Sequence, residues 1–438
     1  MRRTQLDVAV AALVLVATLR AEPDPASERF WPQWRGPYAT GVSKTADPPV
    51  EWSETQNIRW KVEVPGRGSA SPVVWGDRVF VLSAIPAGTT GAASHQPRGG
   101  LQPRDMHQFV VFALDRATGR VVWQRTAREA KPHEASHQDN GTWASSSAFT
   151  DGQRVYAFFD SEGLYAYDMD GKLLWEKDLG DKTMRNEFGE GSTPVLYGNR
   201  IVIVWDHQGP SFVVALDKNT GQEVWRSERK EIDSWATPLV VEHDGRAQVV
   251  TSGMNRLRSY DLETGKIVWE TEGVTMNPIP SPVAADGMVF VTSGFRGNKL
   301  KAIRLADARG DLAGTNAIAW TLDHDTPYVP SPLLYDGILY LLKTNSGILS
   351  AYDAKTGNVH YQLQRLESVP NVFASPVAAS GRIYIPGREG TTIVLKSGTS
   401  YEVLAKNALD DGFDASPALV DKEIYLRGYK SLYAIAKP

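Results

Sequence analysis

His133 and His137 lie four residues apart in the segment HEASHQD, and Asp139 follows them. Imidazole nitrogens and a carboxylate oxygen are ligands that Zn²⁺ accepts in proteins. His95 and His107 belong to the neighbouring segment, so several histidines could share this corner of the molecule. No helix is predicted here, and the spacing is not the H-E-x-x-H motif of zinc hydrolases. A metal-dependent activity centred on His133 and His137 is one hypothesis for function.

A second group of candidates is polar or aromatic, and each member lies just before or just after a predicted strand at one end of a repeated unit. The group consists of Arg67, Asn186, Glu190, Trp235, Asn255, Arg256, Asn277, Arg296, Tyr328, Lys343, Asn371, Arg388, Asp411 and Arg427. Five of its cations come from five different repeats and are expected to converge on an anionic group: Arg256, Arg296, Lys343, Arg388 and Arg427. Acidic residues are available to balance them: Glu190, Asp410, Asp411 and Asp414. A surface of mixed charge suits a polar small molecule, or a protein or peptide partner.

Composition excludes several classes of function. With 47 Lys and Arg against 51 Asp and Glu, the formal net charge is -4, which disfavours nucleic acid as a partner. The chain has no Cys, so disulfides, thiolate metal sites and cysteine nucleophiles are excluded. The sequence contains no G-x-S-x-G, P-loop, dinucleotide-binding or EF-hand motif.

The elements that must position these residues repeat along the chain. Units such as SASPVVWGDRVFVLS at 69, PSPVAADGMVFVTS at 280 and ASPALVDKEIYLRG at 415 open with a small residue and, in most cases, Pro. Each contains two predicted strands around a tight turn, followed by a third strand, a D-x-x-x-G turn and a fourth strand. A period of about 44 residues with four strands per unit is typical of a β-propeller. The predicted fold is all-β, an eight-bladed β-propeller with four antiparallel strands per blade.

The ends of the chain are expected to close this ring. The last unit, ending in SLYAIAKP, lacks a fourth strand, whereas residues 57–64 (NIRWKVEV) form an unpaired strand before the first unit. We therefore predict that this N-terminal strand completes the last blade within a single domain of residues 57–438, which removes the open edge. In such blades the connections between units and the loops between the second and third strands share one face. Because these segments differ in every unit, we expect this loop-rich face to bind the ligand or partner.

Two segments precede the propeller. Residues 1–21 resemble a cleaved signal peptide, with Arg2 and Arg3 before the apolar run from Val8 to Leu19. That run is too short for a transmembrane span, and without Cys the chain is not expected to be a lipoprotein. A periplasmic or secreted location is predicted. Residues 22–56 are rich in Pro and Trp and are predicted to form an extended arm that packs on its own domain.

The repeats carry a recognisable signature. ALDKNTGQEVW, SYDLETGKIVW and AYDAKTGNVHY resemble the repeat of the pyrroloquinoline quinone (PQQ) type β-propeller family. This family includes quinoprotein alcohol dehydrogenases and the outer-membrane assembly lipoprotein B, and the chain most resembles a secreted bacterial branch of it. The resemblance implies an oxidoreductase that binds PQQ and calcium on the propeller axis, or a scaffold without catalysis.

The absence of Cys departs from both subfamilies, because it removes the vicinal disulfide that stacks on PQQ and the lipid anchor. A binding or scaffold role through the loop-rich face is the favoured hypothesis. The alternative is a PQQ- and calcium-dependent dehydrogenase. In that case Asp411 or Glu190 would take the alcohol proton, and Arg256 or Arg296 would polarise the quinone. The metal-dependent activity at His133 and His137 is the third hypothesis.

Overall fold

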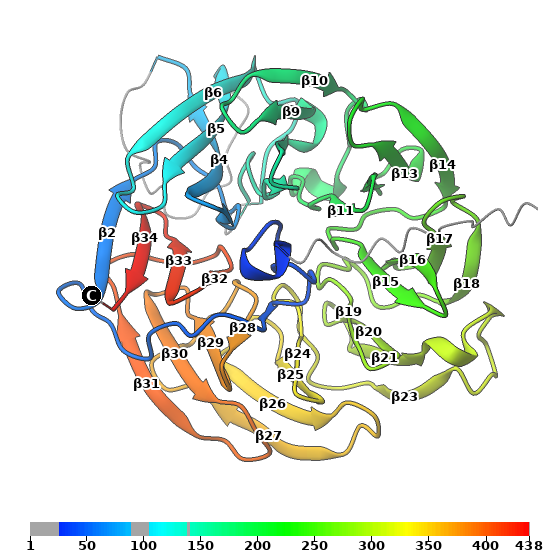
Figure 1. The fold of residues 1–438 in the computed structure, drawn as a ribbon. Coiled ribbons are helices and arrows are strands. Elements are labelled where there is room, and N and C mark those ends of the chain that lie inside the picture. Colours follow the sequence, from blue (N-terminus) through cyan, green and yellow to red (C-terminus); the bar gives the residue numbers. More distant parts are fainter. Residues whose placement is uncertain (1–25, 89–104, 138–140, 438) are drawn as a thin grey trace, which may run out of the picture.

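The computed structural model describes residues 26–88, 105–137 and 141–437, and the predicted export segment lies outside them. Eight small antiparallel sheets stand around a common axis as the blades of a propeller (Figure 1). This arrangement confirms the predicted fold. No helix within the described residues is long and apolar enough to cross a membrane.

Each blade contributes one strand to each of four concentric layers. The innermost strands are β3 (Val73–Trp75), β7 (Phe149–Thr150), β11 (Val195–Tyr197), β15 (Leu239–His243), β19 (Val283–Ala285), β24 (Leu333–Tyr335), β28 (Val377–Ala379) and β32 (Ala418–Val420). The second strands are β4 (Arg78–Pro86), β8 (Arg154–Phe158), β12 (Arg200–Trp205), β16 (Arg246–Thr251), β20 (Met288–Ser293), β25 (Ile338–Leu342), β29 (Arg382–Pro386) and β33 (Glu423–Arg427). The third strands are β5 (His107–Asp115), β9 (Leu164–Asp168), β13 (Ser211–Asp217), β17 (Arg256–Asp261), β21 (Lys299–Arg304), β26 (Ile348–Asp353), β30 (Thr391–Lys396) and β34 (Ser431–Ala436).

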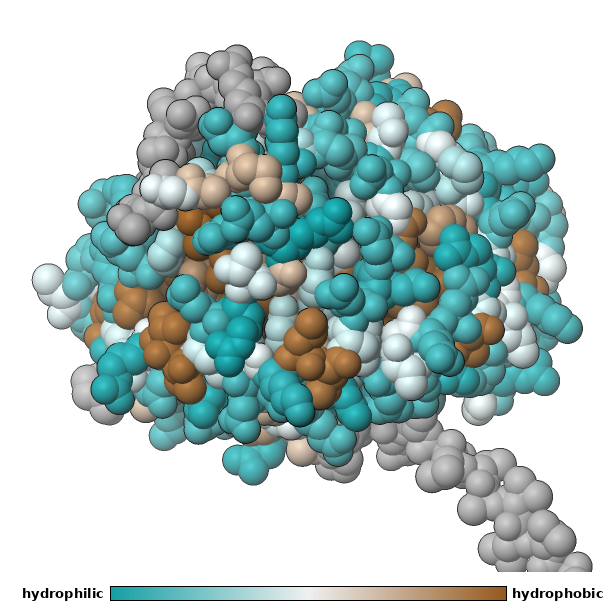
Figure 2. Space-filling view, turned by 90° about the horizontal axis from the view of Figure 1, so that it is seen from above, coloured by the Kyte–Doolittle hydropathy of each residue, from teal (hydrophilic) through white to brown (hydrophobic). Residues whose placement is uncertain are grey.

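The outermost strands leave one edge of each blade at the rim. They are β6 (Val121–Ala130), β10 (Leu173–Lys177), β14 (Glu223–Arg229), β18 (Ile267–Glu272), β23 (Ile318–Leu322), β27 (Val359–Arg365), β31 (Val403–Ala408) and β2 (Ile58–Glu63). The short strand β22 (Gly310–Asp311) pairs in parallel with β18. The 3₁₀ turns are η1 (Ser27–Arg29), η2 (Asp160–Glu162), η3 (Arg185–Glu187) and η4 (Leu305–Asp307). Viewed from the rim, the surface is polar with separate apolar patches (Figure 2).

The N-terminal strand closes the ring, as predicted. β2 pairs antiparallel with β34, with Trp60 opposite Ala434, so the last blade contains both ends of the propeller. A blade whose outer strand comes from the other end of the chain cannot separate from the ring without breaking this pairing.

A seam of hydrogen bonds runs around the axis just before the innermost strands. The backbone N–H of Ser71 donates to Ser147 Oγ at 2.9 Å, and the same contact links each blade to the next. Its eight members are Ser71, Ser147, Thr193, Thr237, Ser281, Ser331, Ser375 and Ser416. The side-chain oxygen of the small residue that opens each unit accepts a hydrogen bond from the preceding blade. This contact explains why a Ser or Thr stands at the start of each unit. We call this set the hydroxyl ring.

Tryptophans of the outer strands join the blades farther from the axis. Trp175 Nε1 donates to Lys218 O in the next blade at 3.2 Å, and its ring lies against Gly221. A Cβ at Gly221, whose φ is 69°, would approach Trp175 Cε3 to 2.6 Å. The same contact recurs where Trp60, Trp123, Trp225 and Trp320 meet the next blade. The outer-strand Trp of one blade and the turn glycine of the next blade thus form the two sides of each of these interfaces.

The arm lies across the centre of the ring on the face opposite the loop-rich face (Figure 1). Trp31 exchanges backbone hydrogen bonds with Val74, and β1 (Val42–Ser43) adds a parallel strand to β28. Arg35 is fully buried and donates to Pro332 O at 2.7 Å. The described part of the arm turns at residues 34–39 and contacts the propeller at these points.

Candidate functional site: an axial pocket on the loop-rich face

A pocket of about 400 Å³ opens on the loop-rich face at the propeller axis. Its aromatic lining consists of Trp34, Phe188, Trp235, Phe295, Tyr328 and Phe373. Six of the eight residues of the hydroxyl ring also line it: Ser71, Thr193, Thr237, Ser331, Ser375 and Ser416. Aromatic faces beside hydroxyl groups suit a ligand that has both a flat or apolar surface and polar atoms.

The floor of the pocket comes from the arm. Trp34 lines the pocket, whereas Gln33 and Pro37 line a second cavity of about 550 Å³ on the opposite face. The arm therefore passes between the two cavities and separates them. The sequence predicts a packing role for the segment WPQWRGP at 31–37, but it does not indicate that one Trp of this segment faces the axis.

The aromatic walls are held by specific contacts. Trp235 Nε1 donates to Gly189 O at 2.8 Å. Tyr328 stacks on Phe295, with ring centroids 4.8 Å apart. Because these rings are fixed by contacts within the protein, the pocket is formed without a ligand.

Two buried acceptors in the pocket lining lack a hydrogen-bond partner among the described residues: Asn277 Oδ1 and Asp414 Oδ1. Asn277 is 3% exposed. Arg388 Nη2 donates to the other Asp414 oxygen at 3.0 Å. Burial raises the pKa of Asp414 to about 6, although the Arg388 guanidinium opposes this shift. Unpartnered buried acceptors are costly, and a ligand that donates hydrogen bonds would relieve the cost.

Glu190 lies at the edge of the pocket. Its carboxylate accepts hydrogen bonds from Ser161 N, at 2.8 Å, and from Ser161 Oγ. Burial and the negative charge of Asp160 raise the pKa of Glu190 to about 8. A carboxyl group with this pKa holds a proton at neutral pH.

The structure brings some of the predicted site residues together. Glu190, Trp235, Asn277 and Tyr328 line the pocket, and Arg388 contacts it through Asp414. These residues come from four connections between blades and one loop within a blade, so their proximity is a product of the ring.

The other cations do not meet on the axis. Lys343 forms an ion pair with Asp325 at 2.8 Å, and Arg256 lies 3.6 Å from Asp311. Arg296 is exposed beside the Phe295 ring. The expected convergence of five cations is not seen because Lys343 and Arg256 are held by acidic residues elsewhere.

Several predicted residues have structural partners. Asp411 accepts hydrogen bonds from the backbone N–H groups of Gly412 and Ser431 and from Tyr433 Oη. Arg427 is buried between blades and donates to Leu82 O, and burial lowers its pKa to about 10. Such roles leave neither side chain available to a ligand in the pocket.

The remaining predicted residues lie outside the pocket lining. Arg67 is partly buried, and Asn186 is exposed with a φ of 52°. Asn371 Nδ2 donates to Glu389 Oε1 at 2.6 Å. Asn255 Nδ2 donates to Lys230 O at 2.5 Å.

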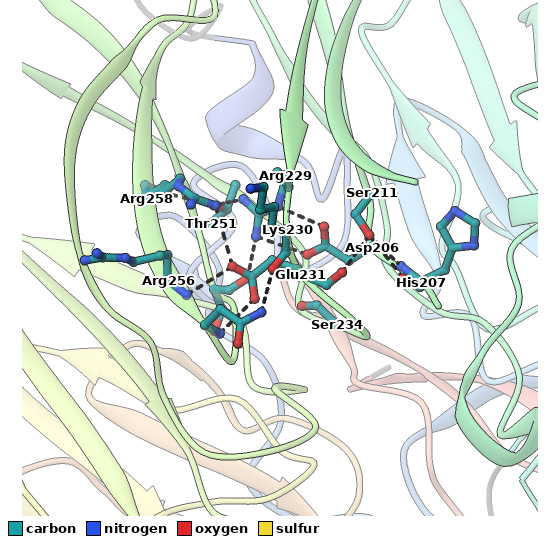
Figure 3. Close-up of polar contacts among 12 residues, drawn as sticks. Asp206, His207, Ser211, Arg229, Lys230, Glu231, Ser234, Thr251, Arg256 and Arg258 are labelled. Atoms are coloured by element: carbon teal, nitrogen blue, oxygen red, sulfur yellow. Dashed lines mark hydrogen bonds and ion pairs between the residues drawn. The ribbon is translucent and has the colours of Figure 1, made fainter. Parts of the chain in front are cut away.

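Glu231 and a buried ion pair fix the loop that carries Asn255 and Arg256 (Figure 3). Glu231 accepts hydrogen bonds from the backbone N–H groups of Asn255, at 2.9 Å, and Arg256, at 3.0 Å. Next to it, Arg229 Nε donates to Asp206 Oδ1 at 2.8 Å, and both side chains are fully buried. The Arg256 side chain extends away from this network (Figure 3). Asp206 and Glu231 therefore stabilise this loop, and neither is among the described residues that line the axial pocket.

The histidines separate. His133 lies beside Glu134 and Glu190, whereas His137 packs edge-on against Phe188 and lines the axial pocket. Asp139 and His95 lie outside the described residues. Sequence reasoning missed the partnership of His133 with Glu190 because the two are far apart along the chain.

These observations define an eight-bladed propeller with an axial pocket closed by its own N-terminal arm. The family model described as "Outer membrane protein assembly factor BamB" matches residues 42–210 and 209–437. The chain therefore belongs to this family of PQQ-like β-propellers.

Individual relatives are more distant. BamB of Shewanella oneidensis is 24% identical over 327 residues, which cover 71% of each chain. Tetrathionate hydrolase of Acidithiobacillus ferrooxidans is 26% identical over 282 residues, 60% of this chain. The match spans 53% of that relative, about half of its length.

Solved structures share the fold. BamB from Moraxella catarrhalis superposes with a TM-score of 0.55 at 14% identity, covering 80% of this chain and 98% of that one. Quinohemoprotein alcohol dehydrogenase from Comamonas testosteroni superposes with a TM-score of 0.64 at 11% identity, covering 94% and 81%.

The pocket lining does not fit PQQ, which carries three carboxylates. No Lys or Arg is among the lining residues that the structure describes, whereas two acids, Glu190 and Asp414, are. Glu190 and Asn277 offer oxygens of the kind that calcium takes, but they add no positive charge for the quinone carboxylates. Arg388 lies over the Phe373 ring but is paired with Asp414, so a buried trianion here would lack sufficient cationic partners and is disfavoured. The residues of this pocket therefore do not support quinone-dependent oxidation.

Proposed function

We propose that the protein is an extracytoplasmic binding or scaffold protein that holds its ligand in the axial pocket of the loop-rich face. The observation that carries this proposal is the pair of buried, unpartnered acceptors, Asn277 Oδ1 and Asp414 Oδ1, inside an aromatic lining. The ligand is a polar small molecule, or a segment of a protein or peptide partner, that donates hydrogen bonds and stacks on the rings.

The family supports a protein partner and a location outside the cytoplasm. Its description names an assembly factor of the outer membrane, and the predicted export segment at 1–21 is consistent with this compartment. A propeller binds partners through loops on one face while its blades stay rigid, so no catalytic group is needed.

Site-specific photo-crosslinking tests the proposal. A crosslinking amino acid replaces Phe188, which lines the axial pocket, and a control carries it at Tyr197, which lines the cavity on the opposite face. Purified protein is exposed to the extracytoplasmic fraction of its source, and adducts are identified by mass spectrometry. We expect adducts at position 188 that are absent at 197 and are lost in the Trp235→Ala variant. Identical adducts at both positions, or adducts that persist in Trp235→Ala, would contradict the proposal.

A further inference from the structure

Three potential metal ligands meet at one wall of the axial pocket. His133 Nε2 lies 3.5 Å from Glu190 Oε1 and 4.0 Å from Glu134 Oε2. One ligand atom from each residue lies within 4.8 Å of the others. In a tetrahedral zinc site with bonds of about 2.0 Å, ligand atoms are about 3.3 Å apart, so a small closure of the cluster would suffice.

A second observation points to a ligand at this place. Glu134 is 7% exposed, and its Oε1 has no hydrogen-bond partner among the described residues. Glu134 and the other two residues line a cavity of about 20 Å³. That volume is sufficient for one water or one metal ion. The cluster is thus an ion-sized space between the buried Glu134, the partly buried Glu190 and the exposed His133, with an unsatisfied carboxylate oxygen in its lining.

The neighbouring cation Lys182 acts on both carboxylates of the cluster, but it is shared with Asp160. Asp160 is paired with Lys182 at 2.7 Å, and Glu162 lies 3.0 Å from Arg128. Within the described part of the chain, the ion-pair partner of Glu134 and Glu190 is His133 alone. Two carboxylates therefore share one imidazole and part of the Lys182 charge, and a divalent cation would balance them.

We propose that His133 Nε2, Glu134 and Glu190 bind a divalent transition metal of the zinc class. Imidazole nitrogen with two carboxylates suits Zn²⁺, whereas calcium sites are built from oxygen ligands. This site keeps His133 of the predicted metal group and adds Glu134 and Glu190, whereas His137 packs against Phe188 and Asp139 lies outside the described residues. His133 Nε2 lies 2.6 Å from Lys182 O, so metal binding requires Nε2 to lose the proton that it donates to this carbonyl and the ring to turn away from it.

The surrounding groups orient the ligands. Met184 N donates to Glu134 Oε2 at 3.1 Å, and this oxygen, which lies 4.0 Å from His133 Nε2, keeps a second lone pair for the metal. Ser161 N donates to Glu190 Oε2 at 2.8 Å, on the oxygen away from His133, and Ser161 Oγ contacts Oε1, which keeps a second lone pair for the metal. Such outer contacts orient metal ligands in known sites.

The metal would lie in the wall of the axial pocket, because Glu190 lines both the small cavity and that pocket. Metal binding by these three residues does not depend on which ligand the axial pocket holds.

Calorimetric titration with Zn²⁺ tests the site. Protein stripped with a chelator and then freed of it is titrated with Zn²⁺ alone, for the wild type and for Glu134→Gln, Glu190→Gln and His137→Gln. The two glutamine variants of the trio keep side-chain volume but lose charge, and His137→Gln is the matched control outside the trio. We expect one Zn²⁺ per chain, at least about 10-fold weaker binding in both glutamate variants, and unchanged binding in His137→Gln.

A second measurement separates metal binding from misfolding. Zn²⁺ should raise the melting temperature of the wild type and of His137→Gln but not of the glutamate variants, because only a native-state site stabilises the fold. Near-ultraviolet circular dichroism checks that each variant is folded. The proposal is overturned if the wild type binds no Zn²⁺, if the glutamate variants bind it as the wild type does, or if Ca²⁺ binds more tightly than Zn²⁺. These results are independent of the crosslinking result, so the two proposals can fail separately.

Discussion

The backbone N–H of Ser416 in the last blade donates to Ser71 Oγ in the first blade at 3.1 Å, although 345 residues separate the two in sequence. This bond closes the hydroxyl ring, in which every member both donates through its N–H and accepts through its side-chain oxygen. The propeller is therefore closed twice, at the axis by this bond and at the rim by the pairing of β2 with β34.

Removing one hydroxyl from the ring should destabilise the protein. In Thr237→Val the shape is retained, but the N–H of Thr193, which donates to Thr237 Oγ1 at 3.0 Å, loses its acceptor. A buried N–H left without a partner costs about 1–3 kcal/mol. Urea unfolding should show a loss of this size, whereas Thr399→Val, at an exposed position, should change stability by less than about 0.5 kcal/mol. Equal effects of the two changes would refute the role of the ring.

The repeats are predictable from sequence because the same contacts recur in every blade. Strand number, ring closure and the Trp positions all follow from a local pattern of small residue, strand, turn and Trp. The second unit, ASSSAFTDGQRVYAFF at 144, is the exception because it lacks the Pro that would align it with Pro72 of the first unit. The hydroxyl ring shows instead that Ser147 corresponds to Ser71, the residue before Pro72.

Gly221, in the turn before the fourth strand of its blade, should not tolerate a side chain because of its contact with Trp175. Gly245 serves as a control that has the same backbone conformation without this contact. In Gly221→Ala the new Cβ would meet the Trp175 ring at 2.6 Å, and the residue has a φ of 69°. Gly245 has a φ of 72° but nothing within 4 Å of its Cβ position. Gly245→Ala should therefore cost only the backbone strain, about 1 kcal/mol, and Gly221→Ala should cost clearly more. Chemical denaturation measures both, and similar losses would mean that the Trp contact is unimportant.

The candidate site is less predictable than the fold, because a pocket at the axis depends on contacts between blades. Trp34 belongs to the arm and reaches the axis only after the ring has formed around it. Lys343 and Arg256 have the right type and position in sequence, but Asp325 and Asp311 hold them elsewhere. The sequence shows which loops face the same side, whereas side-chain partners decide which residues reach the pocket.

Breaking the buried pair of Asp206 and Arg229 should be costly. Asp206→Asn leaves the fully buried Arg229 guanidinium without its counter-charge, and a change of this kind typically costs about 3–5 kcal/mol. Asp325→Asn, which removes the acid of the more exposed pair with Lys343, should cost no more than about 1 kcal/mol. Thermal and urea unfolding of both variants measure the difference. A small loss in Asp206→Asn would show that Arg229 is adequately held by its neutral partners, Thr251 and Tyr260.

Glu190→Gln should change how stability depends on pH. The pKa of Glu190 is about 8 in the folded state and about 4.3 in an unfolded chain. Between these values the folded protein holds a proton that the unfolded chain releases, so the unfolding free energy of the wild type falls as pH rises from about 4 to 8. Asp160, Lys182 and His133 face the carboxyl group and remain in the variant.

Because glutamine does not titrate, the stability of Glu190→Gln relative to the wild type should increase between about pH 4 and 8 in the presence of a chelator. Urea unfolding at several pH values measures this difference, and a constant difference would show that Glu190 does not carry the proton. Adding Zn²⁺ in place of the chelator should restore the wild type at about pH 8 but not the variant, because the metal then compensates the carboxylate charge. The proton at low pH and the metal at higher pH thus stabilise the same buried group.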